Sequence, residues 1–195
     1  MNRKHLSIGI VTVLVALAVA LTGCTGTSPS PGATEGIVSF SSNEPQNKLI
    51  PAITNEVGGG LALQNLFAMP IFYEADGSVK MDTAETITSP DGLNWTITLR
   101  SGLKFSDGSP LKAEHYVNAW QYAASDPRFE NQWWFENFEG YNDGGEDADN
   151  PTVIAESLTL AVVDDTTFTV KLSAPQADFE MTLGYGLCSS ARLVL

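Results

Sequence analysis

The sequence predicts a mixed α/β fold, and three patterns carry that prediction. Residues 95–100 alternate apolar and polar side chains, as in a strand with one buried face. Residues 113–124 repeat apolar side chains at helical spacing, as in an amphipathic helix. Residues 158–162 and 168–172 alternate again on either side of a polar turn, which indicates a β-hairpin. Strands and a helix of this kind in one chain favour a mixed sheet with flanking helices.

The elements before this region are predicted from shorter signals. We expect a first strand at residues 36–41, where the chain reads GIVSFS. Residues 55–60 (NEVGGG) predict a glycine-rich loop whose backbone can approach another group closely. A helix is expected at residues 61–68, and residues 72–74 form a strand that a turn at 76–79 follows.

The strand at residues 95–100 is predicted to continue into a hairpin. Ser101 and Gly102 break the alternation, and residues 103–105 restart it, so we expect these two stretches to pair in antiparallel fashion. A polar turn at residues 106–110 then leads into the helix. The side chains expected in the core are Trp95, Ile97, Leu99 and Phe105 in the hairpin, and Val117, Trp120 and Ala124 in the helix.

Two segments after the helix are unusual in composition. Five aromatic residues crowd the stretch from Phe129 to Phe138, and such density is more often core packing than ligand contact. Residues 140–150 carry four acidic side chains, but their spacing is not that of a calcium-binding EF-hand loop. We therefore interpret residues 140–150 as an acidic surface loop.

The amino terminus resembles a bacterial lipoprotein signal. Basic residues 2–5 precede an apolar run at residues 6–21, which is short for a membrane-spanning helix. Residues 21–24 (LTGC) resemble a lipobox, in which the cysteine receives a diacylglycerol and becomes the new amino terminus; the alternative is an ordinary secretory signal with an incidental cysteine. We predict a signal peptide at 1–23, lipidation of Cys24, and a flexible tether of small and polar residues at 24–35.

Composition excludes several function classes. The 195 residues carry 10 Lys and Arg against 23 Asp and Glu, a net charge of −13, which argues against nucleic acid as a partner. Only Cys24 and Cys188 are cysteines, so a lipidated Cys24 leaves no internal disulfide. Removal of the signal would leave His115 as the single histidine. We therefore expect no metal site, no cofactor and no catalytic relay.

The run from Asp91 to Glu114 identifies a family resemblance. It is similar to the signature region of the family 5 extracellular solute-binding proteins, the oligopeptide, dipeptide and nickel binders of bacterial ABC importers. His115 stands where the family usually has Asp. The matching residues are Asp91, Gly92, Trp95, Leu99, Arg100, Gly102, Lys104, Phe105, Asp107, Gly108, Pro110, Leu111, Ala113 and Glu114.

The resemblance implies a fold, a function and a set of candidate site residues. The family fold is a type II periplasmic-binding-protein-like clamshell, of which residues 36–185 would form an incomplete, N-terminal part. The function implied is capture of an oligopeptide or a related small solute outside the membrane by a monomeric, lipid-anchored protein that delivers it to permease subunits. The glycine-rich segment and the aromatic cluster then become candidates for ligand binding: Asn55, Glu56, Val57, Gly58, Trp133 and Trp134.

The resemblance stops near Tyr185. Residues 186–195 do not match the family, as a truncation or a frameshift would produce; the alternative is a genuine minimal domain. Two other function classes stay open from sequence alone, an extracytoplasmic lipoprotein hydrolase such as a glycosidase and a structural adhesin. Carboxylates are plentiful, but no pair of them lies in a motif that would separate their pKa values.

Overall fold

The computed structural model describes residues 41–125, 131–141 and 158–186. All of them except Ser41 belong to one compact unit, residues 42–195. None of the helices within these ranges has the length and apolar character that crossing a membrane requires. The elements in chain order are α2 (Val57–Leu66), β1 (Ile71–Tyr73), β2 (Val79–Met81), β3 (Ala84–Thr88), β4 (Asn94–Leu99), α3 (Ala113–Ser125), the 3-10 helix η1 (Gln132–Phe135), β5 (Leu160–Val162), β6 (Thr167–Lys171) and α4 (Phe179–Thr182).

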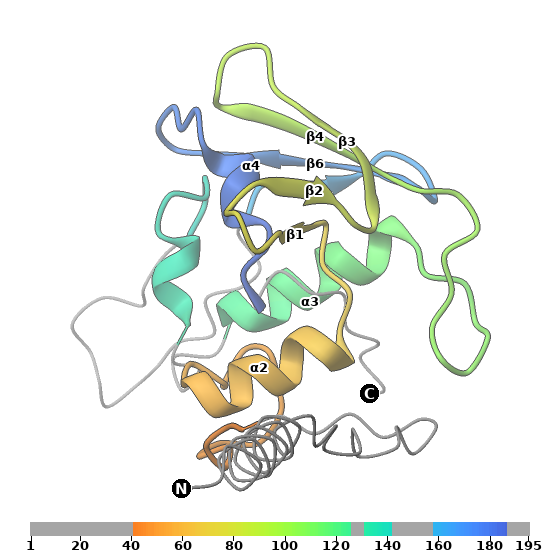
Figure 1. Cartoon of the computed structure of the whole chain (residues 1–195). Coiled ribbons are helices and arrows are strands. Elements are labelled where there is room, and N and C mark those ends of the chain that lie inside the picture. Colours follow the sequence, from red (N-terminus) through yellow and green to blue (C-terminus); the bar gives the residue numbers. More distant parts are fainter. Residues whose placement is uncertain (1–40, 126–130, 142–157, 187–195) are drawn as a thin grey trace, which may run out of the picture. The chain divides into compact units, whose positions relative to one another are not determined.

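The centre of the unit is a four-stranded antiparallel sheet with the order β3-β4-β6-β5 (Figure 1). β4 lies between β3 and β6, with Ile97 opposite Ile87 on one side and opposite Phe168 on the other. The predicted strand at 95–100 and the predicted hairpin of 158–172 are therefore confirmed as β4 and as β5 with β6.

The two faces of the sheet differ in chemistry, as the alternation in the sequence requires. The inner face is apolar, and Ile97, Leu99 and Phe168 on it are 0–2% exposed. The outer face carries threonines in two cross-strand rows, because β-branched side chains suit a pleated, half-buried surface. These rows are Thr88, Thr96 and Thr169, and Thr86, Thr98 and Thr167.

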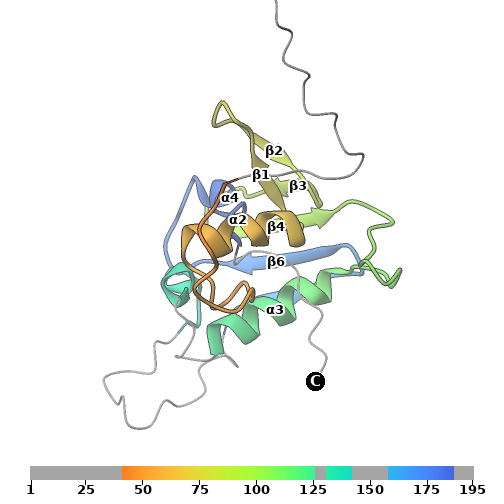
Figure 2. The same cartoon turned by 60° about the horizontal axis from the view of Figure 1, so that its bottom comes forward.

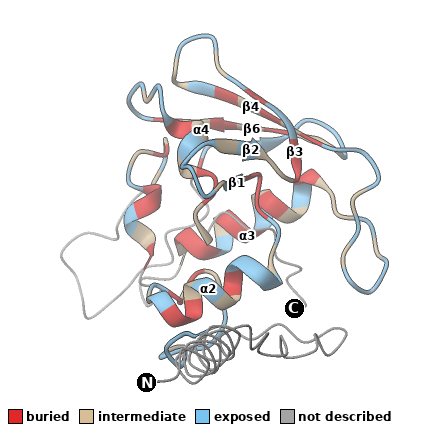
Figure 3. Cartoon of the chain, in the orientation of Figure 1, coloured by how far each residue is buried: buried red, intermediate tan, exposed pale blue. Residues whose placement is uncertain are grey.

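Helix α3 covers the inner face beneath β6 and β5 (Figure 2). The ring of Tyr116 stacks on Phe168 with 5.6 Å between centroids, and Trp120 meets the same ring edge-on at 5.4 Å. The hydroxyl of Tyr116 lies 2.6 Å from the buried hydroxyl of Thr83, which satisfies both polar groups. The buried positions of α3 face the sheet in Figure 3, and the helix matches the predicted 113–124 to within one residue.

The predicted hairpin of residues 95–100 with 103–105 is wrong. β4 pairs with β3 and β6 instead, and residues 103–111 fold back on themselves, with a single bridge between Lys104 and Pro110. Phe105 is consequently half-buried against the ring of His115 rather than in the core. Val117 is also only half-buried, whereas the other predicted core residues, Trp95, Ile97, Leu99, Trp120 and Ala124, are buried.

The glycine-rich segment is a second correction. Gly58, Gly59 and Gly60 form the first turn of α2 rather than a loop, so this helix begins four residues before the predicted start. The predicted strand at 72–74 and its turn are confirmed as the small β1–β2 hairpin. The first strand expected at 36–41, apart from Ser41, lies outside the described residues, as do Phe129, Cys24, Cys188 and residues 142–150 of the acidic loop.

Three chain reversals use the same aspartate motif. In each, one carboxylate oxygen accepts from the backbone N–H and the hydroxyl of the residue two positions later, at 2.6–2.9 Å. This local bonding stabilises the turn without help from distant residues. The pairs are Asp76 with Ser78, Asp107 with Ser109, and Asp164 with Thr166.

Candidate ligand-binding site

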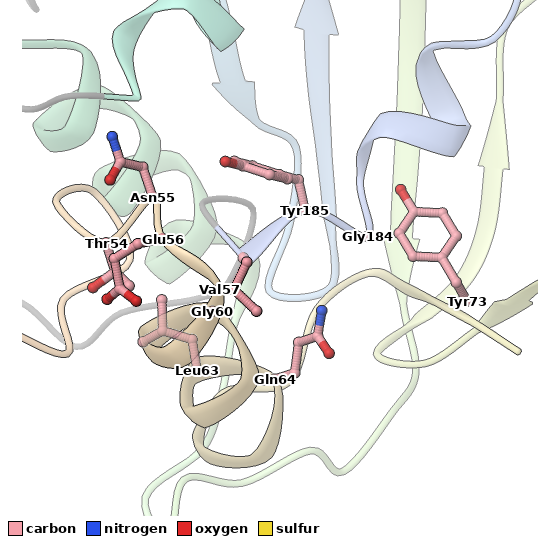
Figure 4. A pocket seen from close by; sticks show the side chains of 11 residues that line it. Thr54, Asn55, Glu56, Val57, Gly60, Leu63, Gln64, Tyr73, Gly184 and Tyr185 are labelled. Atoms are coloured by element: carbon pink, nitrogen blue, oxygen red, sulfur yellow. The ribbon is translucent and has the colours of Figure 1, made fainter. Parts of the chain in front are cut away.

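A solvent-open hollow of about 210 Å³ lies beside the amino-terminal end of α2 (Figure 4). Three parts of the chain that are far apart in sequence contribute to it: residues 54–64, Tyr73 at the end of β1, and residues 184–186 after α4. We call this the first hollow. Its lining residues are Thr54, Asn55, Glu56, Val57, Gly60, Leu63, Gln64, Tyr73, Gly184, Tyr185 and Gly186.

The start of α2 is held in place by its cap and by close packing. Glu56 adopts an extended backbone, and one of its carboxylate oxygens accepts from the N–H of Gly59 at 2.8 Å. Its other oxygen accepts from the N–H of Gln46 at 3.2 Å. A Cβ at Gly58 would collide with the carbonyl oxygen of Asn43. Glycine is therefore needed there for the helix to pack against residues 43–44.

The loop that leads into α2 is anchored from the opposite side by Asn131. This side chain is 1% exposed, and its Nδ2 donates to the carbonyls of Pro51 at 3.2 Å and Thr54 at 3.0 Å. Asn131 directly precedes η1, so it ties the lining residue Thr54 to the element that carries Trp133. The buried carbonyl of Thr54 and the partly buried carbonyl of Pro51 would lose this donor if Asn131 were replaced by an apolar residue.

Aromatic rings form the rest of the border. Tyr185 meets Trp133 edge-on, with 5.6 Å between ring centroids, and Trp133 is 55% exposed. Figure 4 shows Gly184 between Tyr185 and Tyr73. The hydroxyl of Tyr73 donates to the carbonyl of Met181 in α4. The border therefore offers exposed ring faces next to the helix start.

The lining of the first hollow carries a single charged group. Glu56 is the single carboxylate among the lining residues, both of its oxygens accept backbone N–H groups, and no lysine or arginine lines the hollow. The carboxyl groups whose pKa is lowered lie elsewhere: Asp76, Asp91 and Asp164 accept hydrogen bonds at turns, and Glu139 accepts one from Lys171. Within the described ranges no three Asp, Glu, His or Cys side chains gather as metal ligands would.

The structure brings together some of the predicted site residues and separates others. Asn55, Glu56 and Val57 line the first hollow, and Trp133 borders it through Tyr185. Gly58 is buried beneath it against Asn43. Trp134 is 8% exposed and packs in the core against Trp120 and Phe138. Contact of any of these residues with a ligand stays a prediction.

Sequence reasoning missed Gln64, Tyr73 and Tyr185 as lining residues. Gln64 lies one helical turn after Gly60, on the same side of α2, so the correct start of the helix would have pointed to it. Tyr73 and Tyr185 come from elements more than a hundred residues apart, and no local pattern reports such a contact. Only the packing of α4 beside β1 places these two rings at one hollow.

Residues 78–190 match the family described as bacterial extracellular solute-binding proteins, family 5 (middle). The chain belongs to this family. Among curated family members, it is 29% identical to the oligopeptide-binding protein OppA of Bacillus subtilis over 90% of this chain and 33% of that protein. It is 31% identical to the dipeptide-binding protein of Lactococcus lactis over 56% of this chain and 20% of that protein.

Solved structures of family members show the same fold. The unliganded open form of the murein tripeptide-binding protein MppA superimposes with a TM-score of 0.68 over 78% of this chain and 29% of that one, at 23% identity. Haemophilus influenzae OppA in complex with RPPGFSPFR gives a TM-score of 0.68 over 76% and 29%, at 24% identity. The predicted fold, part of a periplasmic-binding-protein clamshell, is confirmed, and the chain spans about a third of the length of these relatives.

Proposed function

We propose that this chain is the peptide-capturing part of a substrate-binding lipoprotein of an ABC importer, which takes up oligopeptides or related small solutes outside the membrane and delivers them to permease subunits. The observation that supports this most directly is the first hollow: an open recess with one carboxylate, amide side chains and aromatic rings, in a member of a solute-binding family. Relatives named for oligopeptides and dipeptides agree with it.

The chemistry of the first hollow suits a peptide backbone. A peptide presents uncharged N–H and C=O groups at regular intervals, and the amide side chains of Asn55 and Gln64 can both donate to and accept from such groups. Val57 and Tyr185 offer apolar surface for one side chain of the ligand. Binding through backbone groups with a pocket for a side chain is a general mode of peptide recognition.

The strength of binding is expected to be low for the 195-residue chain by itself. The first hollow is open to solvent, so it contacts a ligand from one side only. The loss of translational and rotational freedom on association nevertheless costs as much free energy as it does in an enclosed site. We expect dissociation constants in the millimolar range, about −4 kcal/mol, and no saturation at micromolar peptide.

Heteronuclear NMR of the chain with uncharged tripeptides at millimolar concentration tests this proposal. We expect saturable shifts of the backbone amides of Val57, Gly60, Tyr73 and Tyr185, with no shifts in the β5–β6 turn near Asp164 on the far end of the sheet. Disaccharides at the same concentration are the control ligand. Shifts scattered over the surface, or a response to the disaccharide alone, would contradict peptide binding at the first hollow.

A hydrolase of the glycosidase type is the alternative, and the geometry does not favour it. Such enzymes need two carboxyl groups facing each other across the scissile bond, about 5–9.5 Å apart. The first hollow is lined by one carboxylate, that of Glu56, and both of its oxygens are engaged in capping α2 and binding Gln46.

The anchoring part of the proposal concerns residues outside those described. We propose that Cys24 is lipidated and that residues 24–35 tether the binding unit to the extracytoplasmic side of the cell membrane. The support is the sequence Leu21-Thr22-Gly23-Cys24 after an apolar run, together with membership of an extracellular family. Two or more acyl chains give stable anchoring, whereas one is marginal.

A further inference from the structure

A second hollow of about 280 Å³ adjoins the first. It is lined by residues from the end of α2, from the segment that leads into β1, from β1 itself and from the chain after α4. Three residues line both hollows: Gln64, Tyr73 and Gly184. The remaining residues of the second hollow are Asn65, Met69 and Phe72.

The ring of Tyr73 is held between the hollows by two contacts. Its hydroxyl donates to the carbonyl of Met181, which fixes the far end of the ring on α4. Gly184 allows the ring to come close, because a Cβ at that position would lie only 2.7 Å from Cε2 and 2.8 Å from Cζ of Tyr73. A side chain that is 47% exposed is thus kept in one place by the elements on either side of it.

We propose that Tyr73 is a specificity-determining residue: its ring is the partition that limits the size of the apolar group the first hollow can admit. The occupant of that hollow is a small aliphatic side chain of a peptide, and in this respect the inference rests on the function proposed above. The aliphatic side chain of Val57, which lines the hollow and is exposed, matches such a side chain. Removal of the ring joins the two hollows into one groove that reaches Met69 and Phe72.

The partition predicts distinct effects for three variants. Tyr73→Ala opens the groove, so it should accept an aromatic side chain that the wild type excludes. Tyr73→Phe keeps the ring and the close approach to Gly184 and loses only the hydrogen bond to Met181, so it should keep the wild-type preference. Tyr122→Ala removes an equally exposed tyrosine from α3, 45% exposed and outside both hollows, and is the matched control.

NMR titrations of the full chain with Ala-Val-Ala and Ala-Trp-Ala measure the preference. The wild type, Tyr73→Phe and Tyr122→Ala should bind Ala-Val-Ala more tightly than Ala-Trp-Ala. Tyr73→Ala should raise the affinity for Ala-Trp-Ala about tenfold relative to that for Ala-Val-Ala. If Tyr73→Ala binds Ala-Val-Ala at the first hollow as the wild type does and keeps the wild-type ratio of affinities for the two peptides, Tyr73 does not limit the size of the ligand side chain. The proposed function would remain intact in that case.

Indole provides a second probe that does not depend on peptide binding. Val57 lines only the first hollow and Met69 only the second, so in the wild type indole should perturb one of these two amides and not the other, whereas in Tyr73→Ala it should perturb both with one binding curve. If no peptide binds the wild type, the proposed function fails, and the indole titration still tests whether the Tyr73 ring separates the two hollows. Identical indole shifts in the wild type and in Tyr73→Ala would show that it does not.

Discussion

At the scale of single residues, two tryptophans show how burial sets the importance of a side chain. Trp95 is 5% exposed, its ring lies 5.3 Å from that of Phe179, and its Nε1 donates to the carbonyl of Gly92 at 3.0 Å. Trp133 is 55% exposed at the border of the first hollow. The same residue type therefore serves the core in one place and the surface in the other.

Replacing each of these tryptophans by alanine should have very different effects on the free energy of unfolding. Trp95→Ala leaves a cavity between β4 and α4 and should lower the free energy of unfolding by about 3–5 kcal/mol. Trp133→Ala removes mostly exposed area and should change it by less than about 1 kcal/mol. Urea denaturation followed by circular dichroism measures both. Equal midpoints for Trp95→Ala and the wild type would mean that the Trp95 ring does not pack in the core.

Asp91 makes the folding stability of the unit depend on pH in the acidic range. Hydrogen bonds from the backbone and side chain of Asn94, and from the N–H of Leu93, lower the pKa of this carboxyl to about 2 from its ordinary value of 3.8. Folding therefore favours the ionised form. The stabilisation is complete above about pH 4 and disappears as pH falls toward 2, where the folded state takes up the proton as well.

The variant Asp91→Asn tests this pH dependence. Asparagine keeps an oxygen that accepts from the same N–H groups but carries no charge, so the variant should melt at a lower temperature than the wild type at pH 6. The difference in melting temperature should shrink below pH 4 and vanish near pH 2. Glu85→Gln, an exposed carboxylate in β3, is the control. A difference for Asp91→Asn that stays constant from pH 6 to pH 2 would contradict the assignment.

At the scale of elements, helix α2 begins with glycines, although glycine has a low intrinsic helix propensity. Gly58 and Gly59 sit where a Cβ would collide, with the carbonyl oxygen of Asn43 and with the side chains of Glu56 and Thr54 respectively. Gly60, the next residue, faces open space. Packing of the helix start therefore requires glycine at 58 and 59, whereas a Cβ at Gly60 would meet no other part of the protein.

Alanine substitutions at Gly58 and Gly60 should change the stability of the unit in opposite directions. Gly58→Ala forces residues 43–44 away and should destabilise the unit by about 1–3 kcal/mol. Gly60→Ala should stabilise it by about 0.5–1 kcal/mol, because alanine loses less backbone entropy in a helix and meets no neighbour. Thermal denaturation of the two variants measures the effect. A stabilising Gly58→Ala would show that the helix start does not contact Asn43.

At the scale of the whole molecule, the proposed lipid anchor at Cys24 can be tested separately from ligand binding. Cys24→Ala should leave the protein unprocessed or released from the membrane, because the modified side chain is then absent. Membrane fractionation and incorporation of labelled palmitate measure this, and Cys188→Ala is the control with the other cysteine removed. Normal membrane retention and labelling of Cys24→Ala would refute the lipidation proposal.

The sequence by itself determined several local elements and the family. The alternation around Trp95, the stripe of Trp120 and Ala124 in α3, and the turn at Asp164 each involve residues close in sequence, and each was predicted correctly. The composition of the run from Asp91 to Glu114 carried the resemblance that the family match confirmed. Short-range periodicity reports which face of an element is buried, so these features need no knowledge of distant contacts.

Tertiary structure alone decided which elements meet. β4 pairs with β3 and β6 rather than with residues 103–105, because these two strands extend its apolar face on both sides and the short segment closes on Pro110. The glycines at 58–60 are helical because Glu56 caps them and Asn43 packs against them. The first hollow exists because α4 brings Gly184 and Tyr185 to Tyr73 and the start of α2. Contacts between residues a hundred positions apart depend on the packing of whole elements, and local sequence does not encode that packing.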